Sequence, residues 1–406
     1  MIHSSPLPPD AIPAAKPARW TPFAYGFRPF FLLAGLLALC YVPWWVGSVA
    51  LGWPLSTDWP PTLWHGHEML FGYIGAAIGG FLLTAVPSWT GQRGSAGLPL
   101  VALVVVWIAG RLAILSSAAW SPLATAIADL AFLPLLAGYV AVPLLRARSR
   151  NTPLLAVLGL LWACNVVFHV ALARHDAPLA GQAVRSGLDI VLVLVTLIGG
   201  RIIPAFTNAA MKAQGRATRA PSWPWLTPAV LATMMASAIV GLVTVPAGIV
   251  AAVSLVAGIL HGLRLWQWRA PLRLMKPIVW ILHLGYAWLA AGFVLRATAL
   301  LAGSAWAAFW LHALTIGAVT SMILGVMTRA ALGHTGRTLA VAPAITAAYV
   351  LVSAAALMRV FALGVAGLSY PIVLIIAGTL WLAAFALYVA VYAPILLRPR
   401  ADGRPG

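Results

Sequence analysis

Residues 64–90 read WHGHEMLFGYIGAAIGGFLLTAVPSWT, and this stretch decides the fold. No Asp, Glu, Lys or Arg interrupts it between Glu68 and Arg93. A helix needs about 20 mostly apolar residues to cross the hydrocarbon core of a bilayer, and this stretch supplies them. It therefore predicts a transmembrane helix that carries two histidines, His65 and His67, and a carboxylate, Glu68, at its beginning.

The composition of the whole chain repeats this pattern. Hydrophobic residues make up 62% of the 406 residues and charged residues only 8%, and the mean hydropathy is +0.97. Soluble globular proteins carry about 25% charged residues, and disordered chains have low hydrophobicity. A disulfide-stapled domain is excluded because the two cysteines, Cys40 and Cys164, lie in apolar stretches and are too few. The composition is that of an integral membrane protein.

Twelve stretches are long and apolar enough to cross a membrane, and lipid requires them to be helices because backbone polar groups must find partners within the segment. We therefore predict an all-α polytopic fold. It comprises a cytoplasmic Pro-rich tail (1–26), a single twelve-helix membrane domain (27–396) and a cytoplasmic basic tail (397–406). No repeat of 20–50 residues is evident. The expected spans are 27–51, 65–87, 98–118, 122–145, 153–173, 183–205, 225–246, 247–268, 276–300, 305–328, 339–362 and 370–396.

The basic residues predict the orientation. The formal net charge is +18, which in a soluble protein would suggest nucleic acid, but here the charges lie between apolar stretches and no nucleic-acid partner is expected. Of the 25 Lys and Arg residues, Arg174, Arg185, Arg296 and Arg359 fall on one side of the membrane and Arg111 lies within a span, which leaves 20 on the other side. Cytoplasmic loops carry the excess of Lys and Arg, so both termini are predicted to be cytoplasmic.

Ionisable residues inside spans are costly in lipid and therefore indicate functional sites. Their depth, at about 1.5 Å per residue along a helix, divides them into two layers. The inner layer comprises His261, His283 and His334. The outer layer comprises two expected acid–base pairs, Arg111 with Asp129 and Arg185 with Asp189, together with Glu68, Arg296, His65, His67, His169 and His312.

The grouped histidines predict metal binding, since neutral imidazole binds iron, copper and zinc. A single buried histidine serves as often as a hydrogen-bond partner for a neighbouring helix, and spacing alone does not identify the metal. His65 and His67 are two residues apart, about 200° around a helix, so they cannot both face one ion from regular helix. Either the helix begins between them or they serve different partners.

Several longer strings carry a family resemblance: GFRPFFL (26–32), WHGHEMLFGY (64–73), GFLLTAVPSWTG (80–91), GGRIIPAFT (199–207), LHLGYAW (282–288) and HALTIGAVTSMILGVMTRAALGHTGR (312–337). Over nearly its whole length the chain resembles the NnrS family, bacterial membrane proteins of the nitric oxide response that carry haem and copper. The resemblance implies twelve helices with haem b and copper in the bacterial inner membrane, protection against nitrosative stress and an association with denitrification. By motif position it points to His65, His67, His283, His312 and His334 as metal ligands, whereas His169 and His261 rest on depth alone.

The two layers become two predicted sites. In the outer layer the haem iron is expected to take axial imidazole from among His65, His67 and His312. Copper shares this layer through His65 or His169. The inner layer forms a separate site for copper or a second haem. The residues at the right depth to meet haem propionates are Arg111, Arg185 and Arg296.

The expected function is binding of nitric oxide at a metal centre within the membrane, with oxidation or reduction of the gas and an electron donor such as quinol. Glu68, which has no evident basic partner, is predicted to deliver protons or to orient a ligand imidazole. The simpler interpretation is that it caps its helix.

Two alternatives stay open. One is a non-catalytic sensor or scavenger of nitric oxide, and nothing in the sequence separates binding from turnover. The other is a transporter, because twelve spans with buried charges suit that class equally well. The number of histidines favours a metalloprotein over a transporter.

Overall fold

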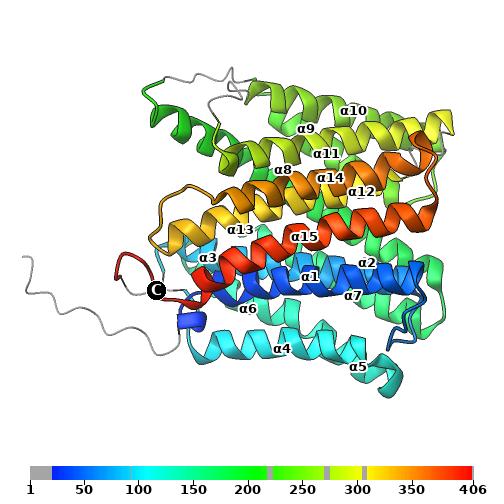
Figure 1. Cartoon of the computed structure of the whole chain (residues 1–406), viewed down its shortest axis with the longest axis horizontal. Coiled ribbons are helices and arrows are strands. Elements are labelled where there is room, and N and C mark those ends of the chain that lie inside the picture. The colour runs from blue at the N-terminus through cyan, green and yellow to red at the C-terminus, as the bar shows by residue number, and fades with distance from the viewer. Residues whose placement is uncertain (1–20, 93, 217–222, 269–274, 304–308, 405–406) are drawn as a thin grey trace, which may run out of the picture.

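The computed structural model shows a bundle of helices that run roughly parallel or antiparallel to one another (Figure 1). It describes residues 21–92, 94–216, 223–268, 275–303 and 309–404. Within these ranges, eleven helical spans are long and apolar enough to cross a membrane. The predicted class, an all-α multi-pass membrane protein, is confirmed.

Most observed helices agree with the predicted spans to within a few residues. The main exception is α8, which is longer than expected at both ends. The helices outside the two composite spans treated below are α1 Phe27–Ala50, α4 Leu98–Leu115, α5 Pro122–Leu130 with α6 Phe132–Arg146, α7 Leu154–Ala173, α8 Ala177–Lys212, α9 Leu226–Leu242, α10 Ala247–Gln267, α11 Pro277–Ala302, α14 Pro343–Val365 and α15 Tyr370–Leu397.

Helix α9 stands where the seventh span was predicted, but it has only 17 residues. Its length of about 26 Å falls short of the roughly 30 Å hydrocarbon core. The two ends of the described chain nevertheless lie at the same end of the bundle (Figure 1), where the Arg28 guanidinium donates to the Leu396 carbonyl oxygen at 2.9 Å. That arrangement requires an even number of crossings, so α9 completes the twelve. Which side is cytoplasmic stays a prediction.

Two spans are composite. The first consists of α2 (Pro61–His67), a π-helical segment η3 (Glu68–Ile74) and α3 (Gly75–Thr90); the second consists of α12 (Trp310–His312), a π-helical segment η7 (Ala313–Thr320) and α13 (Ser321–His334). Single π-helical turns inside α-helices occur frequently at functional sites. In both spans the π-segment begins directly after a histidine.

The two composite spans share a local pattern. Gly72 follows His67 by five residues, and Gly317 follows His312 by five residues. The two histidines lie far apart in the chain, so a search for periods of 20–50 residues does not detect the similarity.

Glycines let the first composite span lie at the centre of the bundle. A Cβ atom added at Gly80 would lie 2.7 Å from the ring of Phe31 in α1, and one at Gly79 would lie 3.2 Å from the ring of Phe132 in α6. Small residues of this kind allow transmembrane helices to approach closely. As a result α3 packs against α1 and α6, and its upstream histidines are held between several helices.

The predicted tails fall mostly outside the described residues. Of the N-terminal tail, 1–26, the structure describes only the last six residues, which include the short 3₁₀ helix η2 (Thr21–Phe23). The C-terminal tail, 397–406, is described as far as residue 404.

Candidate metal centres

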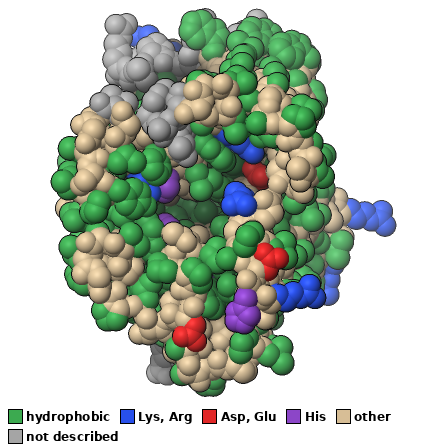
Figure 2. Space-filling view, turned by 90° about the vertical axis from the view of Figure 1, so that its right-hand side faces the viewer, with side chains coloured by type: hydrophobic (Ala, Val, Ile, Leu, Met, Phe, Trp, Pro, Cys, Tyr) green, Lys and Arg blue, Asp and Glu red, His purple; other side chains and the backbone are tan. Residues whose placement is uncertain are grey.

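One end of the bundle is hollowed, and histidine and basic side chains are visible in the hollow (Figure 2). A cavity near this end contains about 990 Å³ of space that no atom fills, its open mouth included. Its walls come from α1, α2 with η3, α8, α12 with η7, α14 and α15.

His65 and His312 face this cavity from the two composite spans, and we call it the His65–His312 cavity. In the part of the chain that the structure describes, neither imidazole makes a hydrogen bond, and the Nδ1 atom of each is buried without a partner. The indole of Trp45 stacks on His65, with ring centroids 4.1 Å apart and planes 19° apart. This contact holds the plane of the His65 ring.

Buried polar atoms without partners are rare in folded proteins and call for an explanation. Around this cavity they recur: besides the two imidazoles, Trp45 Nε1 and one terminal nitrogen of Arg359 have none among the described residues. The remaining walls are mainly apolar, with Val42, Leu374 and others. An apolar cavity with two imidazoles and a buried cation on its walls fits haem b, which needs apolar walls, a nitrogen ligand and partners for its propionates.

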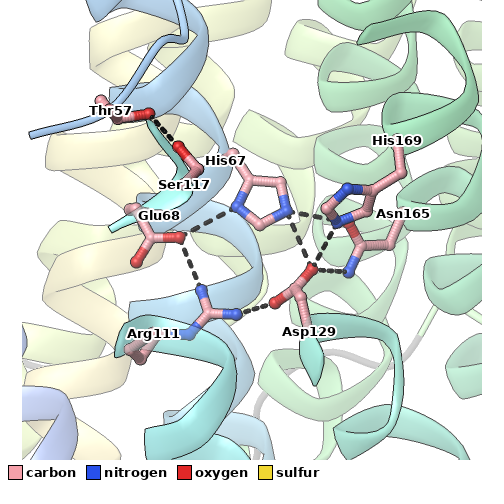
Figure 3. Close-up of polar contacts among 8 residues, drawn as sticks. All are labelled: Thr57, His67, Glu68, Arg111, Ser117, Asp129, Asn165 and His169. Carbon is pink, nitrogen blue, oxygen red and sulfur yellow. Dashed lines mark hydrogen bonds and ion pairs between the residues drawn. The ribbon is translucent and has the colours of Figure 1, made fainter. Parts of the chain in front are cut away.

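His67 points to the other side of the span, into a buried polar cluster (Figure 3). Its Nε2 atom lies 2.8 Å from Asn165 Oδ1 and 3.2 Å from Asp129 Oδ2. His169, one turn after Asn165 on α7, places its Nε2 atom 3.0 Å from the same Asp129 oxygen. The Asn165 amide also donates to that oxygen, at 2.7 Å.

Arg111 joins this cluster from the opposite direction (Figure 3). Its guanidinium donates to Glu68 Oε1 at 2.7 Å and to Asp129 Oδ1. Glu68 Oε1 also lies 3.0 Å from His67 Nδ1. We call the six residues His67, Glu68, Arg111, Asp129, Asn165 and His169 the His67 cluster.

The His67 cluster carries an excess of negative charge away from water. Glu68, Asp129 and Arg111 are 0%, 3% and 5% exposed, and two carboxylates meet a single guanidinium. Buried charges are unfavourable unless they are paired. With neutral imidazoles the cluster therefore lacks one positive charge, which a proton on His67 or a bound cation would supply.

The donor atoms are nearly in place for a cation. One ligand atom each from His67, Asp129 and His169 lies within 4.8 Å of the other two, and all three residues are buried. Ligands about 2.0–2.2 Å from an ion in tetrahedral geometry lie roughly 3.4 Å from one another, close to the 3.0 and 3.2 Å that separate the Asp129 oxygen from the two imidazoles. The residues fit a metal site, and imidazole with carboxylate suits several metals, copper and iron among them.

The loop before α2 closes this cluster. The indole of Trp59 packs edge-on against His67 and His169, with centroids 5.3 and 5.7 Å away. Thr57 and Ser117 share a hydrogen bond of 2.8 Å beside it (Figure 3). The His67 cluster is thus covered, whereas the His65–His312 cavity is open.

The spacing argument about the two neighbouring histidines is confirmed, because His65 and His67 have different partners. The predicted ion pair between Arg111 and Asp129 is also confirmed. The prediction that Glu68 lacks a basic partner is wrong, since Arg111 binds it. Glu68 does not cap a helix either, because it lies at the junction of α2 and η3 inside a continuous helical span.

The basic residues predicted to meet propionates lie in three different places. Arg111 is bound to the two carboxylates of the His67 cluster and does not line the cavity. Arg185 does line it, but its guanidinium donates to Gln182 at 3.1 Å and forms no ion pair with Asp189 among the described residues. Arg296 donates to the Ser237 hydroxyl at 3.1 Å and lies over the Trp310 ring.

The three inner histidines are not brought together. His261 contacts the Tyr286 hydroxyl at 2.8 Å and Met234 Sδ at 3.2 Å. His283 lies 3.3 Å from the Thr207 hydroxyl, and His334 stacks on Tyr25. Within the described ranges, His67, Asp129 and His169 form the one group of three or more potential ligands close enough to share an ion.

Sequence reasoning missed two residues. Asn165 lies in an apolar span and was not singled out, although it precedes His169 by four residues and so lies on the same face of the helix. Arg359 was counted only as an outer charge, although it is the one charged residue of its predicted span, 339–362. Both lie on walls of the sites described above.

A family model described as NnrS protein matches residues 21–400. The chain belongs to the NnrS family. The match includes both composite spans and all residues of the two sites described above. A search of curated proteins finds no match to the chain.

Proposed function

We propose that this NnrS protein binds haem b in the His65–His312 cavity and copper in the His67 cluster, and that it binds nitric oxide there in the bacterial inner membrane as part of the response to nitrosative stress. One observation carries the proposal. Two imidazoles from separate helices face one cavity and have no hydrogen-bond partner among the described residues. Imidazoles that only support packing are normally hydrogen-bonded, as His261 is.

The assignment of copper rests both on the structure of the His67 cluster and on the family resemblance. The charge deficit and the donor spacing of the His67 cluster support a cation, and the family resemblance supports copper as that cation. Glu68 has a defined part in this assignment. Its carboxylate accepts from His67 Nδ1–H, which would orient the ring so that a metal could take the place of the proton that Nε2 shares with Asn165 Oδ1 and Asp129 Oδ2.

When bound, haem iron would supply a coordination position for nitric oxide in place of one of the two imidazoles, and copper would supply or accept an electron. The chain's own residues shape the surroundings. The apolar walls exclude water, and a small neutral gas reaches them through lipid without a polar channel. Arg111 holds Glu68 and Asp129 apart and neutralises part of their charge. For turnover, we propose a membrane quinol as the electron donor.

An absorption spectrum of the purified protein, recorded with and without nitric oxide, tests this function. We expect a Soret band that shifts when the gas is added, and copper close to one per chain. Loss of the gas in the presence of a reductant would identify an enzyme, and a stable adduct a sensor or scavenger. A protein made with haem and copper available that contains neither would contradict the proposal.

A further inference from the structure

Arg359 is the one cation buried in the wall of the His65–His312 cavity. It lies on α14 and is 4% exposed. Its guanidinium carbon lies 4.6 Å from the ring centroid of Phe309 and 5.0 Å from that of Tyr370. One terminal nitrogen donates to the Tyr370 hydroxyl at 3.1 Å. The other, Nη1, is buried without a partner in the described part of the chain.

Among the described residues, no carboxylate forms an ion pair with Arg359. The sequence contains seven acidic residues, and the six within the described ranges are engaged elsewhere or lie in solvent. Glu68 and Asp129 bind Arg111, Asp402 binds Arg400, Asp176 caps α8, Asp189 lies near Arg296 and Arg185, and Asp58 is exposed in the loop before α2. The seventh, Asp10, lies outside the described residues.

A buried cation without a counter-charge is unfavourable. The two aromatic rings provide part of the compensation through their π faces, but the free N–H groups of Nη1 still lack an acceptor. The guanidinium borders the same cavity as the two unpartnered imidazoles. A ligand that fills this cavity would therefore be expected to bring an anionic oxygen to Arg359.

We propose that Arg359 binds a carboxylate of the cavity's ligand, namely a propionate of haem b, with Tyr370 fixing the direction of the guanidinium. This inference rests on the haem assignment above. Guanidinium and carboxylate form paired, charge-assisted hydrogen bonds that are stronger than neutral ones. Arg359 is thus a positioning residue that would hold the carboxylate of a ligand in the His65–His312 cavity.

Arg174 provides a matched control. It is an exposed arginine at the end of α7 and does not line the cavity. Arg174→Gln therefore removes a charge of the same type without removing the proposed contact.

The test compares the affinities of two proteins for two ligands. The full-length chain is prepared in detergent from cells that cannot make haem. Wild type and Arg359→Gln are each titrated with haem b and with haem b dimethyl ester, whose propionates are uncharged. For wild type we expect the ester to bind at least tenfold more weakly than haem. For Arg359→Gln the two ligands should bind within about twofold of each other, and Arg174→Gln should behave like wild type.

The outcomes distinguish a failure of the carboxylate contact from a failure of the haem assignment. If wild type binds haem and its ester equally, the carboxylate contact is contradicted while the haem assignment stands. If wild type binds neither, the haem assignment itself is contradicted. Arg359→Gln could also weaken the binding of both ligands by the same factor, so that the ratio of their affinities stays at the wild-type value. Such a loss would come from poorer folding, and the unchanged ratio would contradict the contact.

Two further variants keep the test sharp if Arg359→Gln folds poorly. Arg359→Lys keeps the charge, so part of the preference for haem over its ester should return. Tyr370→Phe removes only the hydroxyl that orients the guanidinium, and it should reduce the preference by a few fold. An unchanged preference in both Tyr370→Phe and Arg359→Gln would contradict the proposal.

Discussion

His65 and His67 are two residues apart, yet their surroundings are opposite in almost every respect. His65 faces an open cavity, where it makes no hydrogen bond among the described residues. His67 lies in a closed cluster, where both of its ring nitrogens have partners. The cavity is bordered by a buried cation, Arg359, without an acidic partner, whereas the His67 cluster contains two carboxylates for one guanidinium.

The difference shows how one helix serves two ligands of opposite charge. A cavity with a spare cation suits a ligand that carries carboxylates, and a cluster with a spare anion suits a metal cation. The inner histidines form a third environment, with neither feature. His261 and His283 are buried and hydrogen-bonded, so nothing about them requires a ligand.

The largest effect is expected on the cavity side. His312→Ala removes one of two imidazoles that face the cavity, and the haem content per chain should fall to about a tenth or less. Copper should remain, because no atom of the His67 cluster changes. Iron and copper are measured on the same sample, with His175→Asn as a control at an exposed histidine whose φ of +57° asparagine tolerates. Full haem content in His312→Ala would remove this residue from the site.

The next effect concerns the closed side. Asp129→Asn removes the negative charge and leaves a single acceptor oxygen, which cannot serve both the two imidazoles and Arg111. We expect copper affinity to fall at least a hundredfold while the Soret band is kept. Titration with a competing chelator measures the affinity. A variant that loses haem but keeps copper would reverse our assignment of the two sites.

A smaller effect is expected from Glu68→Gln. Gln keeps the size of the side chain but weakens its hold on His67 Nδ1–H and on Arg111. Partners of ligand imidazoles typically contribute 10- to 100-fold to metal affinity, so copper should bind weaker by that factor. Unaltered affinity together with lost turnover of nitric oxide would instead support a role in proton delivery.

The smallest effect on metal is expected at the inner histidines. His261→Gln should leave iron and copper contents unchanged, because His261 already has partners in Tyr286 and Met234. It should lower the stability by about 1–3 kcal/mol, the usual cost of disturbing a buried hydrogen bond, which a thermal denaturation curve reports. A loss of either metal would revive the predicted inner site.

The sequence was sufficient for the spans and for the layer of outer charges, because hydropathy and helical rise determine both. The 200° between His65 and His67 also predicted that they cannot both face one ion from regular helix. The partners of each could not be predicted, since they depend on how the neighbouring helices pack. The estimated depth placed Arg111 at the level of both sites. Only the packing of the helices shows that the absence of a side chain at Gly72 leaves space for the Arg111 guanidinium next to the His67 cluster. Arg359 was overlooked because burial, not depth, distinguishes it from other outer arginines.

One measurement tests the central claim most directly: iron and copper per chain in His65→Ala and in His67→Ala, determined side by side. We predict that His65→Ala loses haem iron and keeps copper, and that His67→Ala loses copper and keeps haem iron. If both variants lose the same metal, the two histidines serve one centre, and the division of this helix between a cavity and a closed cluster is contradicted.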